Sequence, residues 1–463
     1  MKSPVRDECR DLGPGSAAEP ADLERTVFSK AALLILALVL TGALIAGFTG
    51  LPLYQDGSWY LAQLVFGGGP AIAHGRFPAA AIQVPAVLLS KFEAEPSQVR
   101  LGFTLGYALV PFLTLASCWL VVRRSAPIAF LWPALGIICL NVVNFSGVSE
   151  QIIAAQVGWI LLLVALHRGD GAFWRLLLVL GAVVAVFFHK LGGPPLVLIA
   201  IALLMTRRSG GAALVAGVML TLAVAAPIWF VFFPSAYEAN LRDQQILFRY
   251  LFAARPAEWL WISAVLFFGM TVLAARRFPK SDAAWVWVLP GVGSCVVLAA
   301  GMWLAGDFLV EKAGLKCGPS YLAQLVLMGL AIVDARSPQP SRASARAVGW
   351  ALCLVVASSS AITVQKAWFW SRAVARLEVT LSESTEDCVE VTAPRFDWIR
   401  EAPDSIVETW ALPSTALHYQ EPPLTLLLRA GDCAHFRQTG EVRMMRHRTL
   451  RKARVRQAFG RLR

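Results

Sequence analysis

The residues best suited to chemistry lie between residues 51 and 100. In chain order they are Asp56, Trp59, Tyr60, His74 and Arg76. A carboxylate can take or give a proton, cationic groups hold anions, and aromatic rings offer flat apolar faces. Simpler roles stay open for two of them. Asp56 also suits the start of a short helix, and Arg76 could extend toward lipid headgroups.

Other ionisable residues stand at the ends of apolar runs. Glu150 begins one run, and His189 and Lys190 interrupt another. Arg242 and Arg249 are seven residues apart, which places them on one face of a helix, where two guanidinium groups could hold a phosphate. The alternatives are a helix-dipole role for Glu150, a plain span boundary at His189–Lys190, and an exposed amphipathic helix around the two arginines.

The composition indicates that these residues are positioned by a membrane protein. Hydrophobic residues make up 57% of the 463 residues and charged residues only 16%, against about a quarter charged in soluble domains. Apolar runs of spanning length recur along the chain. We therefore predict an all-α polytopic membrane protein with about eleven transmembrane helices, at residues 31–50, 101–122, 126–145, 150–166, 174–189, 192–206, 211–233, 257–275, 283–305, 319–334 and 346–365. Within 174–206, we expect two short helices that meet at a polar break.

The distribution of charge predicts the orientation. Five short loops each carry at least two basic residues, whereas the longer loops between them hold most of the acids. By the positive-inside rule the N-terminus is cytoplasmic. We therefore expect a cytoplasmic tail at 1–30, a transmembrane domain at 31–365 with an outer loop at 51–100, and an extracytoplasmic C-terminal segment at 366–463. In the outer loop, 79–92 is too short to span and is predicted as an interfacial helix with Lys91 at its wet edge.

The C-terminal segment ends in a basic run from Arg443 to Arg463. This run could bind anionic headgroups or an envelope polyanion, or it could be a solvated helical tail. Cys388 and Cys433 are the cysteines of this segment, and an oxidising compartment would favour their pairing, with Cys317 as a competitor. The net charge of +12 follows from topology and headgroup contacts, so we predict no nucleic-acid partner.

The layout resembles the GT-C glycosyltransferase superfamily, which includes protein O-mannosyltransferases, lipid A aminoarabinose transferases and oligosaccharyltransferases. The residues that carry the resemblance are Gln55-Asp56-Gly57 and His74-Gly75-Arg76 in the first outer loop and Ser149-Glu150-Gln151 in the second. Members often carry an acidic pair in the first loop, but Gly57 follows Asp56 here. We assign no metal ligands, and a divalent metal ion is the one cofactor that the resemblance leaves open.

The resemblance implies an inverting transfer of a sugar from a polyprenyl-phosphate donor to a hydroxyl of an envelope glycan, lipid or protein. It implies Asp56 or Glu150 as the base, and Trp59 and Tyr60 as sugar platforms. The donor phosphate would bind basic residues of the outer loops, of which the candidates are Arg76, His189, Lys190, Arg242 and Arg249. His74 is a further candidate for substrate binding. The expected location is the outer face of a bacterial cytoplasmic membrane.

Two other classes of protein compete with this interpretation. A transporter or flippase for a lipid-linked or anionic solute would need charged residues deep inside spans, and the middle of each predicted span is almost wholly apolar. A membrane acyltransferase would need a His-Asp or paired-His motif, which His189-Lys190-Leu191-Gly192 does not supply. A non-catalytic envelope assembly protein stays open as well.

Overall fold

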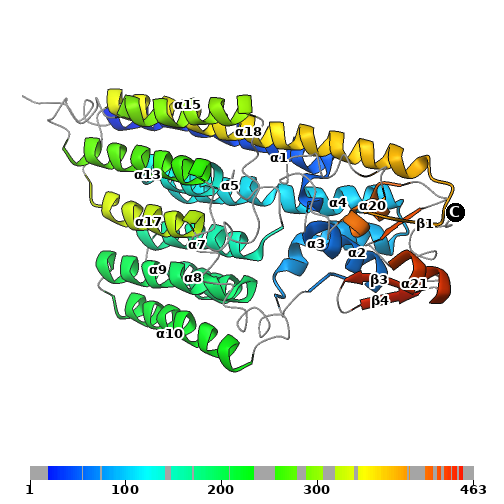
Figure 1. The fold of residues 1–463 in the computed structure, drawn as a ribbon. Helices are drawn as coiled ribbons and strands as arrows, with labels where there is room; N and C mark the ends of the chain where they lie inside the picture. The colour runs from blue at the N-terminus through cyan, green and yellow to red at the C-terminus, as the bar shows by residue number, and fades with distance from the viewer. Residues whose placement is uncertain are drawn as a thin grey trace, which may run out of the picture.

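The structure is a computed structural model in which long helices form a bundle with a smaller folded part at one end (Figure 1). The described residues are 19–54, 56–72, 76–140, 148–168, 171–207, 209–233, 256–278, 288–305, 319–337, 342–393, 396, 412–420, 425–428, 432–439, 441–445 and 448–451. All statements about the structure refer to these residues. His74, Arg242 and Arg249 lie outside them.

Helices occupy all eleven segments predicted to span the membrane. They are α1 (Glu19–Thr49), α4 (Pro96–Ala108) with α5 (Val110–Val122), a broken helix at Pro127–Cys139, α7 (Glu150–His167), α8 (Ala172–Phe188), α9 (Gly193–Thr206), α10 (Gly210–Phe232), α13 (Pro256–Arg277), α15 (Val288–Ala305), α17 (Pro319–Asp334) and α18 (Arg342–Ser382). Among the described residues, six of these helical stretches are long and apolar enough to cross a membrane. The chain is therefore a polytopic helical membrane protein, and the number of crossings stays a prediction.

The polar break inside residues 174–206 is present as predicted. Helix α8 ends at Phe188, a short 3-10 turn covers Lys190–Gly192, and α9 begins at Gly193. Gly192 packs so closely that a Cβ there would lie 2.4 Å from the carbonyl oxygen of Ala185. Two antiparallel helices can therefore follow each other with almost no loop.

The helix at residues 127–139 is irregular. It begins with a 3-10 turn at Pro127–Phe130, and after Pro133 the segment Ala134–Cys139 is wound as a π-helix. This form is common where a helix is distorted for a functional or packing reason. Trp132 donates its indole N–H to the Asp334 carboxylate at 2.8 Å, and Arg276 forms an ion pair with the same carboxylate. The side chains of Arg276 and Asp334 are only 5% and 3% exposed, so this contact ties three helices together inside the bundle.

The segment at residues 51–100 that was predicted as the first outer loop is folded, and it keeps that name below. After the 3-10 turn Leu51–Leu53 come α2 (Asp56–Gly67) and α3 (Ala79–Lys91), and α3 packs against α4. A Cβ on Gly57 would lie 1.7 Å from the carbonyl oxygen of Pro52, so glycine is required for α2 to turn back at once. The predicted short helix at 79–92 is present as α3.

The C-terminal segment begins without a break in secondary structure. Helix α18 continues for 17 residues beyond residue 365, where the last span was predicted to end. It is followed by β1 (Cys388–Glu390), α20 (Leu412–His418), β2 (Leu426–Leu428), α21 (Asp432–Thr439), β3 (Glu441–Met445) and β4 (Arg448–Arg451). Strands β1 and β2 are parallel, with Val389 opposite Leu427. Strands β3 and β4 are antiparallel, so the helical alternative for the basic run is wrong for residues 443–445 and 448–451.

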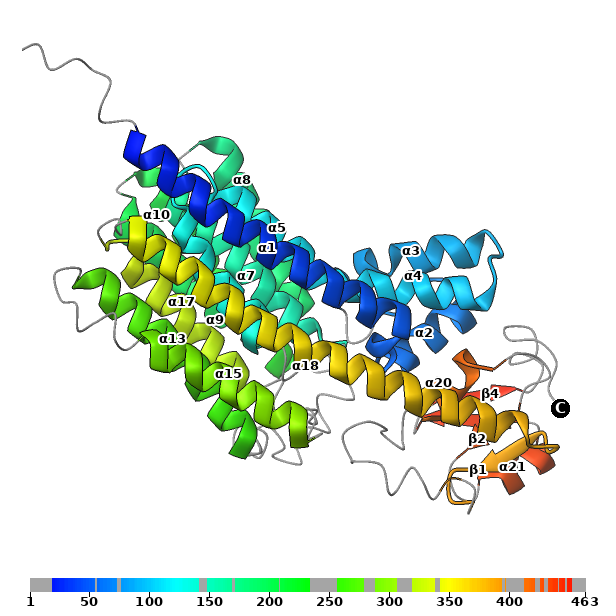
Figure 2. The ribbon, with the colours of Figure 1, turned by 90° about the horizontal axis from the view of Figure 1, so that it is seen from above.

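The first outer loop and the C-terminal segment lie at the same end of the bundle. Figure 2 shows α2, α3, α20 and α21 at this end, which we call the loop end, and the first turns of α1 at the other. Helix α2 contacts α20 directly. This arrangement agrees with an odd number of crossings between the N-terminus and the C-terminal segment.

We expect single cysteines at Ser125, which follows α5, and Ser382, which ends α18, to react with a membrane-impermeant maleimide from opposite sides. Both serines are exposed. The background would carry Cys9→Ser and Cys317→Ser, which lie outside the described residues, since the four free cysteines within them are buried. Labelling of both positions from one side of intact vesicles would contradict the odd count.

Candidate functional site

Glu150 is a buried carboxylate at the loop end. It is the first residue of α7 and is 4% exposed. Its Oε1 accepts a hydrogen bond from the Tyr60 hydroxyl at 2.6 Å, and its Oε2 accepts one from Arg76 Nη1 at 2.8 Å. An unpaired buried carboxylate would cost several kcal/mol. The two contacts offset that cost and join the first outer loop to the start of α7.

Asp56 borders the same tyrosine. It is the first residue of α2, where a negative charge is favourable, and it lies four residues before Tyr60, on the same helix face. Burial raises the pKa of the Tyr60 phenol well above its ordinary value, and the negative charges of Glu150 and Asp56 raise it further. The phenol therefore stays protonated and donates to Glu150. Both predicted catalytic carboxylates therefore act electrostatically on Tyr60, and Glu150 is hydrogen-bonded to it.

Trp59 lies at the edge of this group. Its ring centroid is 5.1 Å from that of Tyr60, with the planes tilted by 44°. The side chain is half-buried and packs on the apolar cluster that surrounds Tyr60. Tyr60 itself is buried and its hydroxyl is used by Glu150. Of the two predicted sugar platforms, Trp59 is the one with an accessible surface.

Gln83 fixes the chain that leads from α2 to Arg76. Its Oε1 accepts the backbone N–H of Ala71 at 2.8 Å, and its Nε2 donates to the carbonyl of Ala71 at 2.9 Å and to the Tyr107 hydroxyl at 3.2 Å. Gln83 is not among the residues predicted from the sequence. Its position in the middle of an apolar helix could have identified it, because a buried amide there must find polar partners.

The C-terminal segment holds α2 from the other side. His418 Nε2 lies 3.1 Å from the carbonyl oxygen of Ser58, which identifies this nitrogen as the donor. Arg100 donates to the carbonyl of His418 at 2.7 Å and lies over the ring of Tyr419, 4.4 Å from its centroid. These contacts join residues more than 300 positions apart in the chain, so the sequence alone gave no sign of them.

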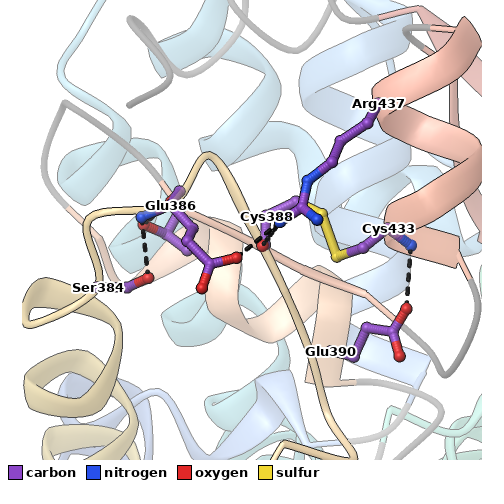
Figure 3. A network of polar contacts seen from close by, with 7 residues as sticks. Ser384, Glu386, Cys388, Glu390, Cys433 and Arg437 are labelled. Atoms are coloured by element: carbon purple, nitrogen blue, oxygen red, sulfur yellow. Dashed lines mark hydrogen bonds and ion pairs between the residues drawn. A yellow bond between two sulfur atoms is a disulfide. The ribbon is translucent and has the colours of Figure 1, made fainter.

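A disulfide stabilises the part of the C-terminal segment that packs on α2. The predicted bond between Cys388 and Cys433 is present, and Figure 3 shows it beside the ion pair between Glu386 and Arg437. The Cys433 N–H also points to the Glu390 carboxylate. Both cysteines belong to an apolar cluster that reaches Ala62 of α2. The disulfide therefore supports the helix that begins with Asp56.

The remaining residues that were predicted for the site make other contacts or are outside the described residues. His189 is buried at the end of α8, and its Nδ1 accepts the backbone N–H of Leu191 at 3.1 Å. That contact fits the span-boundary alternative. The backbone of Lys190 lies in the same turn, but its side chain is not described. No group of three potential metal ligands occurs within the described ranges, and His74 falls outside them, so metal dependence is untested.

Comparison of the chain with protein-family models, curated proteins and solved structures finds no match. The resemblance to the GT-C superfamily therefore stays a prediction, and the site has to be judged on its own geometry.

We expect Glu150→Ala to lower the free energy of unfolding by roughly 3 kcal/mol, because it leaves Arg76 and Tyr60 without their buried acceptor. Glu150→Gln should cost less, since the amide oxygen still accepts one bond. Chemical unfolding in mixed micelles measures both. The control is Glu383→Ala, at an exposed glutamate. An equal effect at both glutamates would show that the buried pair does not stabilise the fold.

A pH dependence follows from His418. Burial lowers its pKa to about 3, and the nearby charge of Arg100 adds to this effect, while the bond to Ser58 opposes it. As the pH is lowered, the imidazole of His418 therefore takes up its proton in the unfolded state at a higher pH than in the folded state. Stability is complete above the unfolded pKa of about 6.5 and falls as the pH drops toward 3, by up to about 1.4 kcal/mol per pH unit.

Thermal unfolding between pH 7 and pH 4 measures this loss. The His418→Gln variant keeps a side-chain N–H donor but has no group that titrates at this position. Its stability should therefore fall less between pH 7 and pH 4 than that of the wild type. Identical pH profiles for the two proteins would exclude His418 as the titrating group.

Proposed function

We propose that the chain is a GT-C-type glycosyltransferase, which moves a sugar from a polyprenyl-phosphate donor to a hydroxyl of an envelope glycan, lipid or protein. One observation supports it most: Glu150 contacts both Tyr60 and Arg76 at one end of the bundle, and the negative charge of Asp56 acts on the same Tyr60. A base and a cation are the two groups that this reaction needs.

In the proposed reaction the acceptor oxygen attacks the anomeric carbon of the sugar. The new carbon–oxygen bond forms as the bond between that carbon and the lipid phosphate breaks, with inversion at carbon. Asp56 takes the acceptor proton. The polyprenyl phosphate leaves with the electron pair of the broken bond, and Arg76 stabilises its growing negative charge.

The contacts give Asp56 and Glu150 different roles. Both oxygens of Glu150 accept short hydrogen bonds and the side chain is buried, so we assign it the role of orienting Arg76 and Tyr60. Asp56 is half-buried at the beginning of α2, which makes it the better candidate for the general base. Trp59 offers the aromatic face against which a sugar ring can pack.

Helix α3 suits a donor that arrives within the membrane. Val84 and Leu88 are exposed on one face of this helix, and Phe77 and Phe92 are exposed just before and just after it. Ala79, Gln83 and Ala86 are buried. A short helix with an exposed apolar face lies at a membrane interface. Arg76 immediately precedes Phe77, so a phosphate bound there would have its isoprenoid chain beside α3.

In the proposed topology the loop end faces away from the cytoplasm of a bacterium, and the N-terminus is cytoplasmic. The basic residues at the opposite ends of α5, α7, α9 and α13 agree with it under the positive-inside rule. The disulfide in the C-terminal segment agrees with an oxidising compartment on the outer side.

A transporter or flippase is the second candidate. The buried pair Arg276–Asp334 favours it, because charged side chains inside a membrane bundle often mark a solute path. Asp334 is the last residue of α17, and Arg276 is the second-last of α13. A structural ion pair that joins the ends of these two helices explains the same contact. Uptake of a lipid-linked sugar into sealed proteoliposomes without any transfer to an acceptor would favour this candidate.

We expect Asp56→Asn to reduce glycosyl transfer by about a hundred- to ten-thousand-fold, because the amide cannot accept the proton. Folding should be retained, since Asn suits a helix start as well as Asp. The assay is transfer from a polyprenyl-phosphate sugar to envelope acceptors in membranes. Glu95→Gln is the matched control, an exposed acid at the beginning of α4. Near-normal transfer by Asp56→Asn would remove Asp56 from the mechanism, and a deletion strain with unchanged surface glycans would contradict the proposed function.

A further inference from the structure

A hollow lined by three arginines lies at the end of the bundle opposite the loop end. Arg168 caps the end of α7, Arg175 is in the first turn of α8, and Arg207 caps the end of α9. The first turn of α10 closes the fourth side. The enclosed cavity is small, about 10 Å³, which is room for roughly one water molecule, so an anion would bind at its open mouth. All three arginines are half-buried, so their charges are only partly screened by water.

Neighbouring groups hold these arginines in place. Arg168 donates to the carbonyl of Leu120 at 2.6 Å, and its guanidinium lies 5.2 Å from the ring of Trp174. Arg207 donates to the carbonyl of Arg168. Arg175 lies against Gly211, where a Cβ would be 2.0 Å from its Nη1. The glycine therefore lets this guanidinium approach the beginning of α10.

The charges of the three arginines are not balanced within the described part of the chain. None of them forms an ion pair with a described carboxylate, whereas Arg276 at the same end of the bundle is paired with Asp334. Asp170 is not described. Helices α8 and α10 begin beside the hollow, and the partial positive charge of a helix N-terminus favours an anion there. Three fixed cations and two helix N-termini around one space favour an anion that can accept several hydrogen bonds, such as a phosphate.

The surroundings of the hollow are apolar. Phe173, Leu176, Leu204, Met205 and Leu214 are exposed on α8, α9 and α10 close to the arginines in sequence. These side chains suit contact with acyl chains, which a free phosphate does not have. Basic pockets between transmembrane helices are known binding sites for anionic headgroups.

We propose that this hollow binds the phosphate of an anionic phospholipid in the leaflet at this end, with its acyl chains along α8, α9 and α10. The arginines bind the phosphodiester oxygens, and the exposed apolar side chains contact the lipid tails. The site is separate from Asp56, Arg76 and Glu150, and it does not depend on the proposed glycosyl transfer.

Native mass spectrometry of the full chain, with phosphatidylglycerol and phosphatidylcholine of equal chain length, tests the proposal. The wild type should retain phosphatidylglycerol in preference to phosphatidylcholine. Arg175→Gln should weaken that retention by about fivefold, the usual effect of one cation near a lipid headgroup. Arg175 is chosen because, unlike Arg168 and Arg207, its side chain donates to no described helix-end carbonyl. The matched control is Arg124→Gln, at an exposed arginine near the end of α5, which should bind as the wild type does.

Equal losses at Arg175 and Arg124, or no preference for the anionic lipid in the wild type, would overturn the proposal. A second measurement separates the two sources of phosphate. Phosphatidylglycerol should raise the thermal midpoint of the wild type and raise it less in Arg175→Gln, while inorganic phosphate at millimolar concentration should shift neither. Stabilisation by inorganic phosphate alone would overturn the lipid assignment. Unchanged thermal midpoints of the lipid-free variants show that they are folded.

Discussion

The structure depends most on the burial of one carboxylate, that of Glu150. A charge at the end of an apolar helix, shielded from water, is stable only if cationic or hydrogen-bonding partners reach it. The partners, Tyr60 and Arg76, come from the first outer loop. The loop must therefore fold back onto the beginning of α7 rather than extend into solvent. That constraint places α2, the connection to α3 and Asp56 at one position above the bundle.

The C-terminal segment completes the same unit. Helix α18 carries the chain out of the bundle without interruption, so the segment that follows starts from a rigid support. His418 and Arg100 then fasten it to α2 and α4, and the disulfide keeps β1 and α21 together behind them. The proposed base is thus held between two parts of the chain that are distant in sequence. A change in either part should alter the position of Asp56, even where no residue near it is replaced.

The sequence predicted the elements better than their contacts. Apolar runs and basic loops were sufficient to locate the helices, because local polarity decides where a helix lies. The break between α8 and α9 was predicted from His189 to Pro195, since polar residues and prolines interrupt a helix. Helix α18 continues past the predicted end of the last span at residue 365, because residues 366–382 contain no glycine or proline to stop a helix. Glu150 and Arg76 were predicted separately, but the contacts of Glu150 with Tyr60 and Arg76 join residues up to 90 positions apart and depend on packing. A solvated helix is one of the two alternatives that the composition allows for the basic run, whereas residues 443–445 and 448–451 of this run lie in the paired strands β3 and β4.

The most direct test of the proposed function is photocrosslinking with a polyprenyl-phosphate analogue whose reactive group is next to the phosphate. Peptide mapping of the labelled chain in membranes should place the crosslinks on α2, on the segment around Arg76 and on the first turn of α7. Arg76→Ala should reduce this labelling, and excess unmodified polyprenyl phosphate should compete with it. Crosslinks confined to the Arg168–Arg175–Arg207 end, or labelling of the loop end that polyprenyl phosphate does not displace, would contradict the proposed donor site.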